Sequence, residues 1–138
     1  SSAEKEIEKL QTQQVASEFA NKLDNTEKIE GVTVLRTMLP EASMDALREM
    51  ADKFRSKYDS GIAVLASAYE GKPVLIAAVT EDLVKRGLHA GKLVKLVAQV
   101  VGGGGGGRPT LAQAGGKDPS KISEALDQVP GYIRDNLD

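Results

Sequence analysis

The pattern of apolar and polar positions divides the chain into a helical lead-in followed by alternating strands and helices. Residues 3–24 are strong helix formers without Gly or Pro, and their apolar side chains recur every three to five positions. This spacing predicts a helix. An isolated helix of this length is marginal in water, so it must pack on the domain, a second copy or an upstream region. Its apolar stripe consists of Ile7, Leu10, Val15, Phe19 and Leu23.

The next part of the chain predicts a strand, a helix and a hairpin. A turn over residues 25–31 leads into a β-branched strand over residues 31–39. Ser43 is a suitable N-cap for an amphipathic helix. Residues 62–69 and 74–80 are apolar almost throughout and indicate two hairpin strands that are covered on both faces.

The last third of the chain predicts further helices and one more strand. A short helical turn over residues 81–87 precedes an amphipathic helix over residues 89–101, and residues 110–114 are a strand candidate. Asp118 is a suitable N-cap for a final helix that breaks at Pro130. The fold class is therefore α/β, with α+β as the alternative: a small, mostly apolar sheet of four to five strands flanked by helices.

Composition narrows the function. The 138 residues, 41% apolar and 28% charged, suit one globular domain. The absence of Cys and the single His exclude a thiol nucleophile and a multi-His metal site. No apolar run is long enough to span a membrane, so we expect an intracellular protein without a membrane partner. The chain opens on Ser1 rather than Met, as expected of a piece of a longer chain.

Charge is distributed unevenly along the chain. Residues 83–121 contain seven Lys and Arg against a single acid, Asp118, whereas the remaining residues carry a net charge of −8. A basic segment in an acidic protein favours a polyanionic partner such as nucleic acid. The alternative is a solvated helix face that happens to be rich in Lys.

The run of six glycines from Gly102 to Gly107 allows two interpretations. Residues without Cβ let the backbone approach another surface closely and present its N–H groups, which beside Arg108 would suit a phosphate or a sugar edge. Such a loop would be costly to order without its ligand. The alternative is a passive flexible linker. A dinucleotide fingerprint is excluded because the run follows a helix, and a phosphate-binding P-loop is excluded because Arg108-Pro109 replaces its Lys and hydroxyl.

Catalytic groups are not evident in the sequence. No Ser or acid stands where local spacing would place it beside His89, so a nucleophilic triad is unsupported. His89 itself is expected at a helix start or as an RNA contact. The few aromatic residues are scattered, which disfavours a single-stranded nucleic acid and favours a structured RNA recognised through its backbone and shape.

The segment from Val100 to Leu126 resembles the closing motif of the C-terminal domain of alanyl-tRNA synthetase, which also accompanies DHH-type phosphoesterases. The resemblance rests on the glycines followed by Arg108-Pro109, on AQAGG over residues 112–116 and on Asp118-Pro119. It covers roughly residues 31–137. By this resemblance, residues 1–26 are the end of a helical stalk, and residues 27–138 are the globular DHH-associated, tRNA-binding domain.

The resemblance implies a non-catalytic domain of an alanine–tRNA ligase that binds the outer corner of L-shaped tRNA in the cytoplasm and assists aminoacylation and editing. Its partners would be alanine-specific tRNA and the rest of the synthetase, with a homodimer left open and no cofactor. In phosphoesterase relatives a His follows the glycines and helps to hold a nucleotide substrate; Arg108 here favours binding without hydrolysis. The alternatives are a nucleotide-binding phosphoesterase domain and a dimerisation module. The expected tRNA-binding residues are Lys85, Arg86, Lys92, Lys95, Gly102, Gly103, Gly104, Gly105, Gly106, Gly107, Arg108, Gln113 and Lys117.

Overall fold

The computed structural model describes residues 17–138, in which strands and helices alternate largely as predicted. A helix occupies residues 17–23; the rest of the predicted lead-in helix, with Ile7, Leu10 and Val15, lies outside the described residues. The strands are β1 (Glu27–Ile29), β2 (Val32–Leu39), β3 (Ile62–Tyr69), β4 (Lys72–Val79), β5 (Gly104–Gly107) and β6 (Leu111–Gly115). The helices are α2 (Met44–Lys57), α3 (Glu81–Val84), α4 (Ala90–Val100), η1 (Pro119–Lys121), α5 (Ile122–Leu126) and α6 (Val129–Asn136).

Over the described residues the strands form one six-stranded mixed sheet in the order β1-β2-β3-β4-β6-β5. Strands β2 and β3 are parallel, with α2 as the crossover between them, and the other neighbours are antiparallel. The predicted count of four to five strands was too low. Strand β1 lies where a turn was expected, and the glycine run supplies β5. Both short strands escape the sequence pattern because neither has the alternating apolar positions of a half-buried strand.

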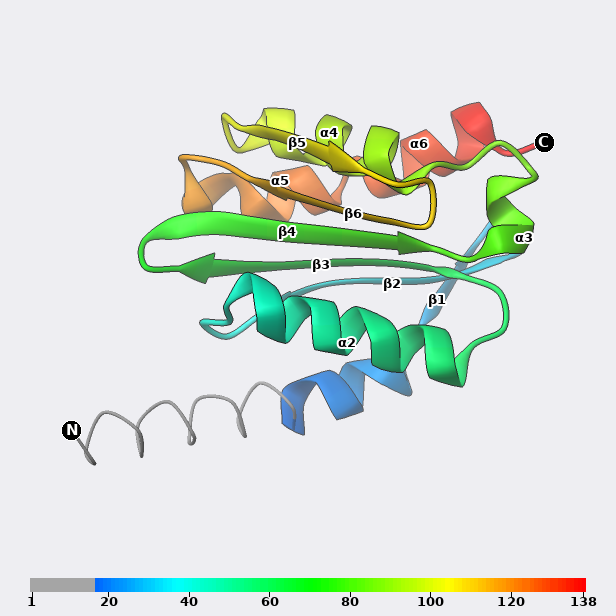
Figure 1. Ribbon diagram of the computed structural model, residues 1–138, viewed down its shortest axis with the longest axis horizontal. Coiled ribbons are helices and arrows are strands. Elements are labelled where there is room, and N and C mark those ends of the chain that lie inside the picture. The colour runs from blue at the N-terminus through cyan, green and yellow to red at the C-terminus, as the bar shows by residue number, and fades with distance from the viewer. Residues whose placement is uncertain (1–16) are drawn as a thin grey trace.

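Helices cover both faces of the sheet (Figure 1). Helix α2 packs on one face, and α4, α5 and α6 pack on the other. The central strands β3 and β4 contribute buried side chains to both of the resulting cores, as their continuous apolar sequence predicted. The two strands are joined by Glu70 and Gly71, both with positive φ, as a tight two-residue hairpin requires.

Most of the predicted helix ends are confirmed. The Ser43 side chain accepts a hydrogen bond from the Ala46 N–H and begins α2, while Asp118 caps η1 through the Ser120 N–H. The break in the last helical segment was placed wrongly. It falls between α5 and α6 at residues 127–128, and Pro130 lies in the first turn of α6, where its missing N–H costs no helical hydrogen bond.

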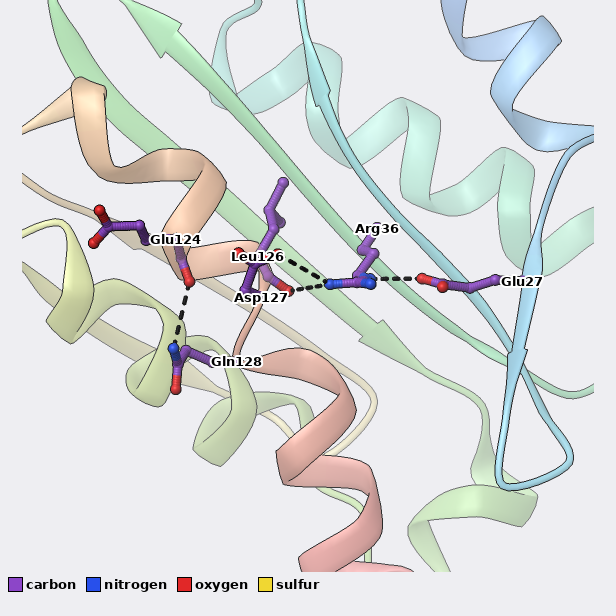
Figure 2. A network of polar contacts seen from close by, with 6 residues as sticks. All are labelled: Glu27, Arg36, Glu124, Leu126, Asp127 and Gln128. Carbon is purple, nitrogen blue, oxygen red and sulfur yellow. Dashed lines mark hydrogen bonds and ion pairs between the residues drawn. The ribbon is translucent and has the colours of Figure 1, made fainter.

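A network centred on Arg36 attaches α5 to the sheet (Figure 2). The Arg36 Nε donates to Glu27 Oε1 at 2.6 Å, which joins β2 to β1. Its Nη1 donates to the Leu126 carbonyl at 3.1 Å and lies 3.5 Å from Asp127 Oδ1. The Arg36 side chain thus donates to an open carbonyl at the end of α5 and joins this helix to β1 and β2, which lie about 90 residues earlier in the chain.

The helix over residues 17–23 belongs to the core on the α2 side. Phe19 is 1% exposed and packs in the same cluster as Leu47 and Phe54 of α2. The Tyr58 hydroxyl donates to the Leu23 carbonyl at 2.6 Å. Among the described residues, no helix has the length and apolar character needed to cross a bilayer.

Candidate nucleic-acid interface

Four residues of the glycine run, Gly104–Gly107, form an edge strand of the sheet, so this part is neither the loop nor the linker that the sequence suggested. Gly104–Gly107 pair antiparallel with β6, Gly104 opposite Gly115 and Gly107 opposite Ala112. Strand β5 ends the sheet order and all four of its residues are exposed. The run is therefore already ordered by the sheet, and its backbone is accessible along the outer edge.

Alternate glycines of this run have no room for a side chain. A methyl group on Gly105 would lie 2.4 Å from both the Ala114 Cβ and the Gln113 carbonyl oxygen, and one on Gly103 would lie 1.9 Å from the Gly115 carbonyl oxygen. A methyl group on Gly104 or Gly106 would meet no atom within 4 Å. Glycine is thus required on one face of the strand by packing, while on the other face it leaves the backbone bare.

Helix α4 lies against β5 and carries the predicted lysines. A methyl group on Gly91 would come within 2.9 Å of the Gly107 carbonyl oxygen, and the Gly103 N–H donates to the Ala98 carbonyl at 2.9 Å. Lys92 and Lys95 are exposed on this helix. Lys95 lies one turn beyond Gly91, on the side of α4 that faces the glycine strand.

His89 lies at the start of α4, which confirms the helix-start position expected from the sequence. Its Nδ1 accepts a hydrogen bond from the Lys92 N–H at 3.2 Å, as an N-cap does. Its backbone N–H donates to the Tyr132 hydroxyl oxygen, which in turn donates to the His89 carbonyl. Burial raises the pKa of Tyr132 above its ordinary value, although the hydrogen bond to the His89 backbone opposes this. These contacts join the first turn of the lysine helix to α6.

The turn between β5 and β6 brings Arg108 to a shallow cavity of about 490 Å³. Its walls also include Gln113 of β6 and Arg48 of α2, whose Nη2 donates to Gln113 Oε1 at 2.6 Å. Gly106 and Gly107 form part of the lining. Arg48 was missed by the sequence analysis, because it is one charged residue on the polar side of an ordinary amphipathic helix and its partner is 65 residues away.

Lys117 lies at the opposite end of the glycine strand from Arg108. Its Cβ is 3.8 Å from the position that a methyl group on Gly102 would occupy, and its N–H donates to the Val101 carbonyl at 2.8 Å. The neighbouring Asp118 is the acid of the basic segment. Hydrogen bonds from the Ser120 hydroxyl and N–H lower its pKa, and so it stays charged as a helix cap.

Lys85 and Arg86 are exposed residues that directly follow α3. Arg86 contacts the end of the chain rather than the β5–β6 hairpin. The Arg86 Nε donates to the Asp138 carbonyl at 3.1 Å, and the Arg86 carbonyl accepts from the Asp138 N–H at 2.7 Å. Arg86 thus holds the C-terminal residue. The structure brings Gly102–Gly107, Arg108, Gln113 and Lys117 together around the β5–β6 hairpin. Lys92 and Lys95 are exposed on α4, the helix that lies against β5.

These observations define a small α/β domain with an exposed glycine edge strand, with Arg108 at one end of that strand and Lys117 near the other. The chain belongs to the DHHA1 domain family, which it matches over residues 31–135. This finding confirms the resemblance noted in the sequence.

The chain is similar to one part of longer proteins. It is 51% identical over 134 residues to the alanine–tRNA ligase of Pelotomaculum thermopropionicum, covering 97% of this chain and 15% of the ligase. It is 50% identical over 131 residues to the alanine–tRNA ligase of Geobacillus kaustophilus, covering 95% of this chain and 15% of that ligase. The chain thus spans about 15% of the length of these relatives. Its fold is similar to the C-Ala domain of Aquifex aeolicus alanyl-tRNA synthetase, with a TM-score of 0.73 and 29% identity over 78% of this chain and 96% of that one.

Proposed function

We propose that this chain is the non-catalytic tRNA-binding domain of a cytoplasmic alanine–tRNA ligase, and that it holds the outer corner of the tRNA while the rest of the synthetase acts on the acceptor end. The observation that carries the proposal is the hairpin itself. An exposed strand without side chains runs between lysines of α4 and arginines of α2 and the β5–β6 turn.

The chemistry of this surface suits a phosphate backbone. Lys and Arg neutralise phosphates without reading the sequence, and a strand made of glycine lets a sugar–phosphate chain approach the protein backbone. The aromatic residues do not form a stacking platform. Phe19, Phe54 and Tyr132 are buried, Tyr58 is partly buried, and Tyr69 stands alone at the end of β3. A structured RNA recognised by its shape therefore fits better than an unpaired strand.

The alternative of a nucleotide-holding role, as in a phosphoesterase, gains no support from a second cavity near the same hairpin. This cavity, of about 360 Å³, is lined by Thr110 of the β5–β6 turn together with Asp59, Glu81, Asp82 and Arg55. Its three carboxylates outnumber the single guanidinium, so this cavity is a poor site for a nucleotide phosphate. Binding of mononucleotides to the isolated chain, or their hydrolysis by it, would favour the phosphoesterase alternative.

The salt dependence of tRNA binding tests the proposal. We expect log K to fall linearly with log salt concentration, with a slope of about −0.7 to −0.9 for each phosphate contacted. Fluorescence anisotropy with a labelled tRNA between 50 and 300 mM salt, at protein concentrations of roughly nanomolar to micromolar, gives this slope. Affinity that does not change with salt contradicts the proposal. Sedimentation velocity of the same samples separates tRNA binding from a purely dimerising role.

A charge-matched pair of variants locates the surface. Replacing both Lys92 and Lys95 by Ala should weaken binding of all tRNAs equally, because phosphate contacts carry no sequence information. Replacing Lys22 and Lys53, which are exposed on the other side of the sheet, removes the same charge and should change affinity little. Equal losses from the two pairs would show that net charge alone, rather than this surface, drives binding.

A further inference from the structure

The cavity of about 490 Å³ beside the β5–β6 turn is lined by two arginines that are distant in the sequence, Arg48 and Arg108. Arg48 lies on α2, which covers one face of the sheet, and Arg108 lies in the turn that follows β5. The α4 lysines belong to the layer on the other face. The basic surface therefore does not end at the edge strand but continues around it.

The floor of the cavity includes bare glycine backbone. Gly106 stands opposite Gln113 in the sheet register, and a methyl group on Gly106 would meet nothing within 4 Å. The remaining lining consists of Gly107, Leu111 and Ala112. No carboxylate lines this cavity among the described residues, so its charged walls are the two guanidinium groups.

Arg48 has hydrogen-bonding capacity that its contacts in the fold leave unused. One nitrogen donates to Gln113 Oε1, and another lies 3.5 Å from Asp45 Oδ1 on the preceding turn of the helix. The Arg48 side chain is 45% exposed and that of Asp45 is 90% exposed, so this ion pair contributes little to stability. A guanidinium carries five N–H donors in a planar fork that matches phosphate oxygens. The Gln113 contact orients the fork over the glycine floor.

We propose that this cavity binds a phosphodiester of the RNA backbone between Arg48 and Arg108, so that the bound RNA strand crosses the glycine edge and contacts both layers of the domain. This inference rests on the proposed function and assigns a new phosphate-binding residue to it. Lys92 and Lys95 hold the RNA on the α4 side, and Arg48 holds the neighbouring phosphate on the α2 side.

The test compares two arginines of the same helix. Arg48→Ala should weaken tRNA binding roughly sixfold at 0.1 M salt and make the salt slope less steep by about 0.8, the contribution of one phosphate. Arg55→Ala is the matched control, because Arg55 also lies on α2 and also pairs with the Asp three residues before it. It should leave affinity and slope unchanged. Arg48→Lys should keep the salt slope but lose part of the affinity, since an ammonium lacks the planar fork.

A double-mutant cycle tests whether one phosphate is shared. If Arg48 and Arg108 hold the same phosphodiester, the loss from the combined Ala variant is smaller than the sum of the two single losses. Additive losses would overturn the shared site, and equal affinities of Arg48→Ala and Arg55→Ala would overturn the role of Arg48. Both results leave the proposed function standing if Lys92→Ala with Lys95→Ala still weakens binding. Absence of salt-dependent tRNA binding by the unmodified chain would instead overturn the proposed function and this inference with it. Circular dichroism melts confirm that each variant is folded.

Discussion

Two neighbouring glycines of β5 should respond to the same substitution in opposite ways. Gly104 and Gly105 are both exposed and both have negative or extended φ, so alanine is compatible with the backbone at each position. Their surroundings differ. A methyl group on Gly104 enters open space, whereas one on Gly105 would lie 2.4 Å from the Ala114 Cβ and 2.5 Å from its Cα.

The magnitude follows from two terms. Replacing Gly by Ala reduces the entropy of the unfolded chain and stabilises a compatible site by about 0.4–1 kcal/mol. This term is common to both variants and cancels when they are compared. Forcing an extra methyl group into a packed site costs about 1–3 kcal/mol. We expect Gly104→Ala to be as stable as the parent or slightly more stable, and Gly105→Ala to be about 1–3 kcal/mol less stable than Gly104→Ala.

Urea unfolding followed by circular dichroism measures this difference. The two variants should show equal m-values and different midpoints, because the clash changes stability and not the surface exposed on unfolding. The thermal midpoints should differ by several degrees. If Gly105→Ala unfolds at the same urea concentration as Gly104→Ala, the close approach of β5 to β6 is wrong, and with it the structural reason for glycine at alternate positions.

Three further changes probe the fold. Phe19→Ala should lower the free energy of unfolding, measured with urea, by about 3–5 kcal/mol, because this ring is 1% exposed in the core under α2. A loss below about 1 kcal/mol would show that Phe19 does not belong to that core. Arg36→Met should lower the free energy of unfolding by about 1–2 kcal/mol, because it leaves the Leu126 carbonyl without its charged donor. Glu27→Gln should lower it less, because the Gln side chain can still accept a hydrogen bond from Arg36. Burial alone would raise the pKa of Asp82, but hydrogen bonds from Ser60, from Thr80 and from backbone N–H groups outweigh it and lower the pKa below its ordinary 3.8. The stabilisation from the charged Asp82 is therefore present above about pH 4 and is lost as pH falls below 3.8. The parent should unfold at a higher urea concentration than Asp82→Asn at pH 6, and this difference in urea midpoint should become smaller by pH 3. A difference that does not change with pH contradicts this.

The sequence was informative wherever one element's own residues decide its structure. Continuous apolar runs identified β3 and β4 and their burial on both faces, and the capping residues Ser43 and Asp118 identified two helix starts. The 3.6-residue spacing also showed that Lys92 and Lys95 would lie on the exposed side of α4. These features depend on neighbours within a few positions, which a linear pattern records.

The rest depended on contacts between distant segments. A glycine run has no side-chain period, so its pairing with β6 is determined by the hairpin at Arg108 and by the approach of α4, neither of which the run itself encodes. Strand β1 is three residues long and pairs through its backbone with β2. Arg48 reaches the site because β6 pairs with β4 beneath α2, which brings residue 113 under residue 48. No spacing rule connects those two positions.

The pure glycine composition of β5 follows from two separate demands on its two faces. On the side of Gly103 and Gly105, packing against β6 leaves no space for a methyl group, and a single Cβ there disturbs the sheet. On the side of Gly104 and Gly106 a methyl group would meet no atom within 4 Å, so packing inside the domain does not explain glycine there. Under the proposed function, the bare backbone on this second side leaves room for the RNA. The cavity bounded by Arg48, Gly106 and Arg108 lies next to that bare surface. A phosphate chain bound there would come close to the protein backbone because no side chain lies between them.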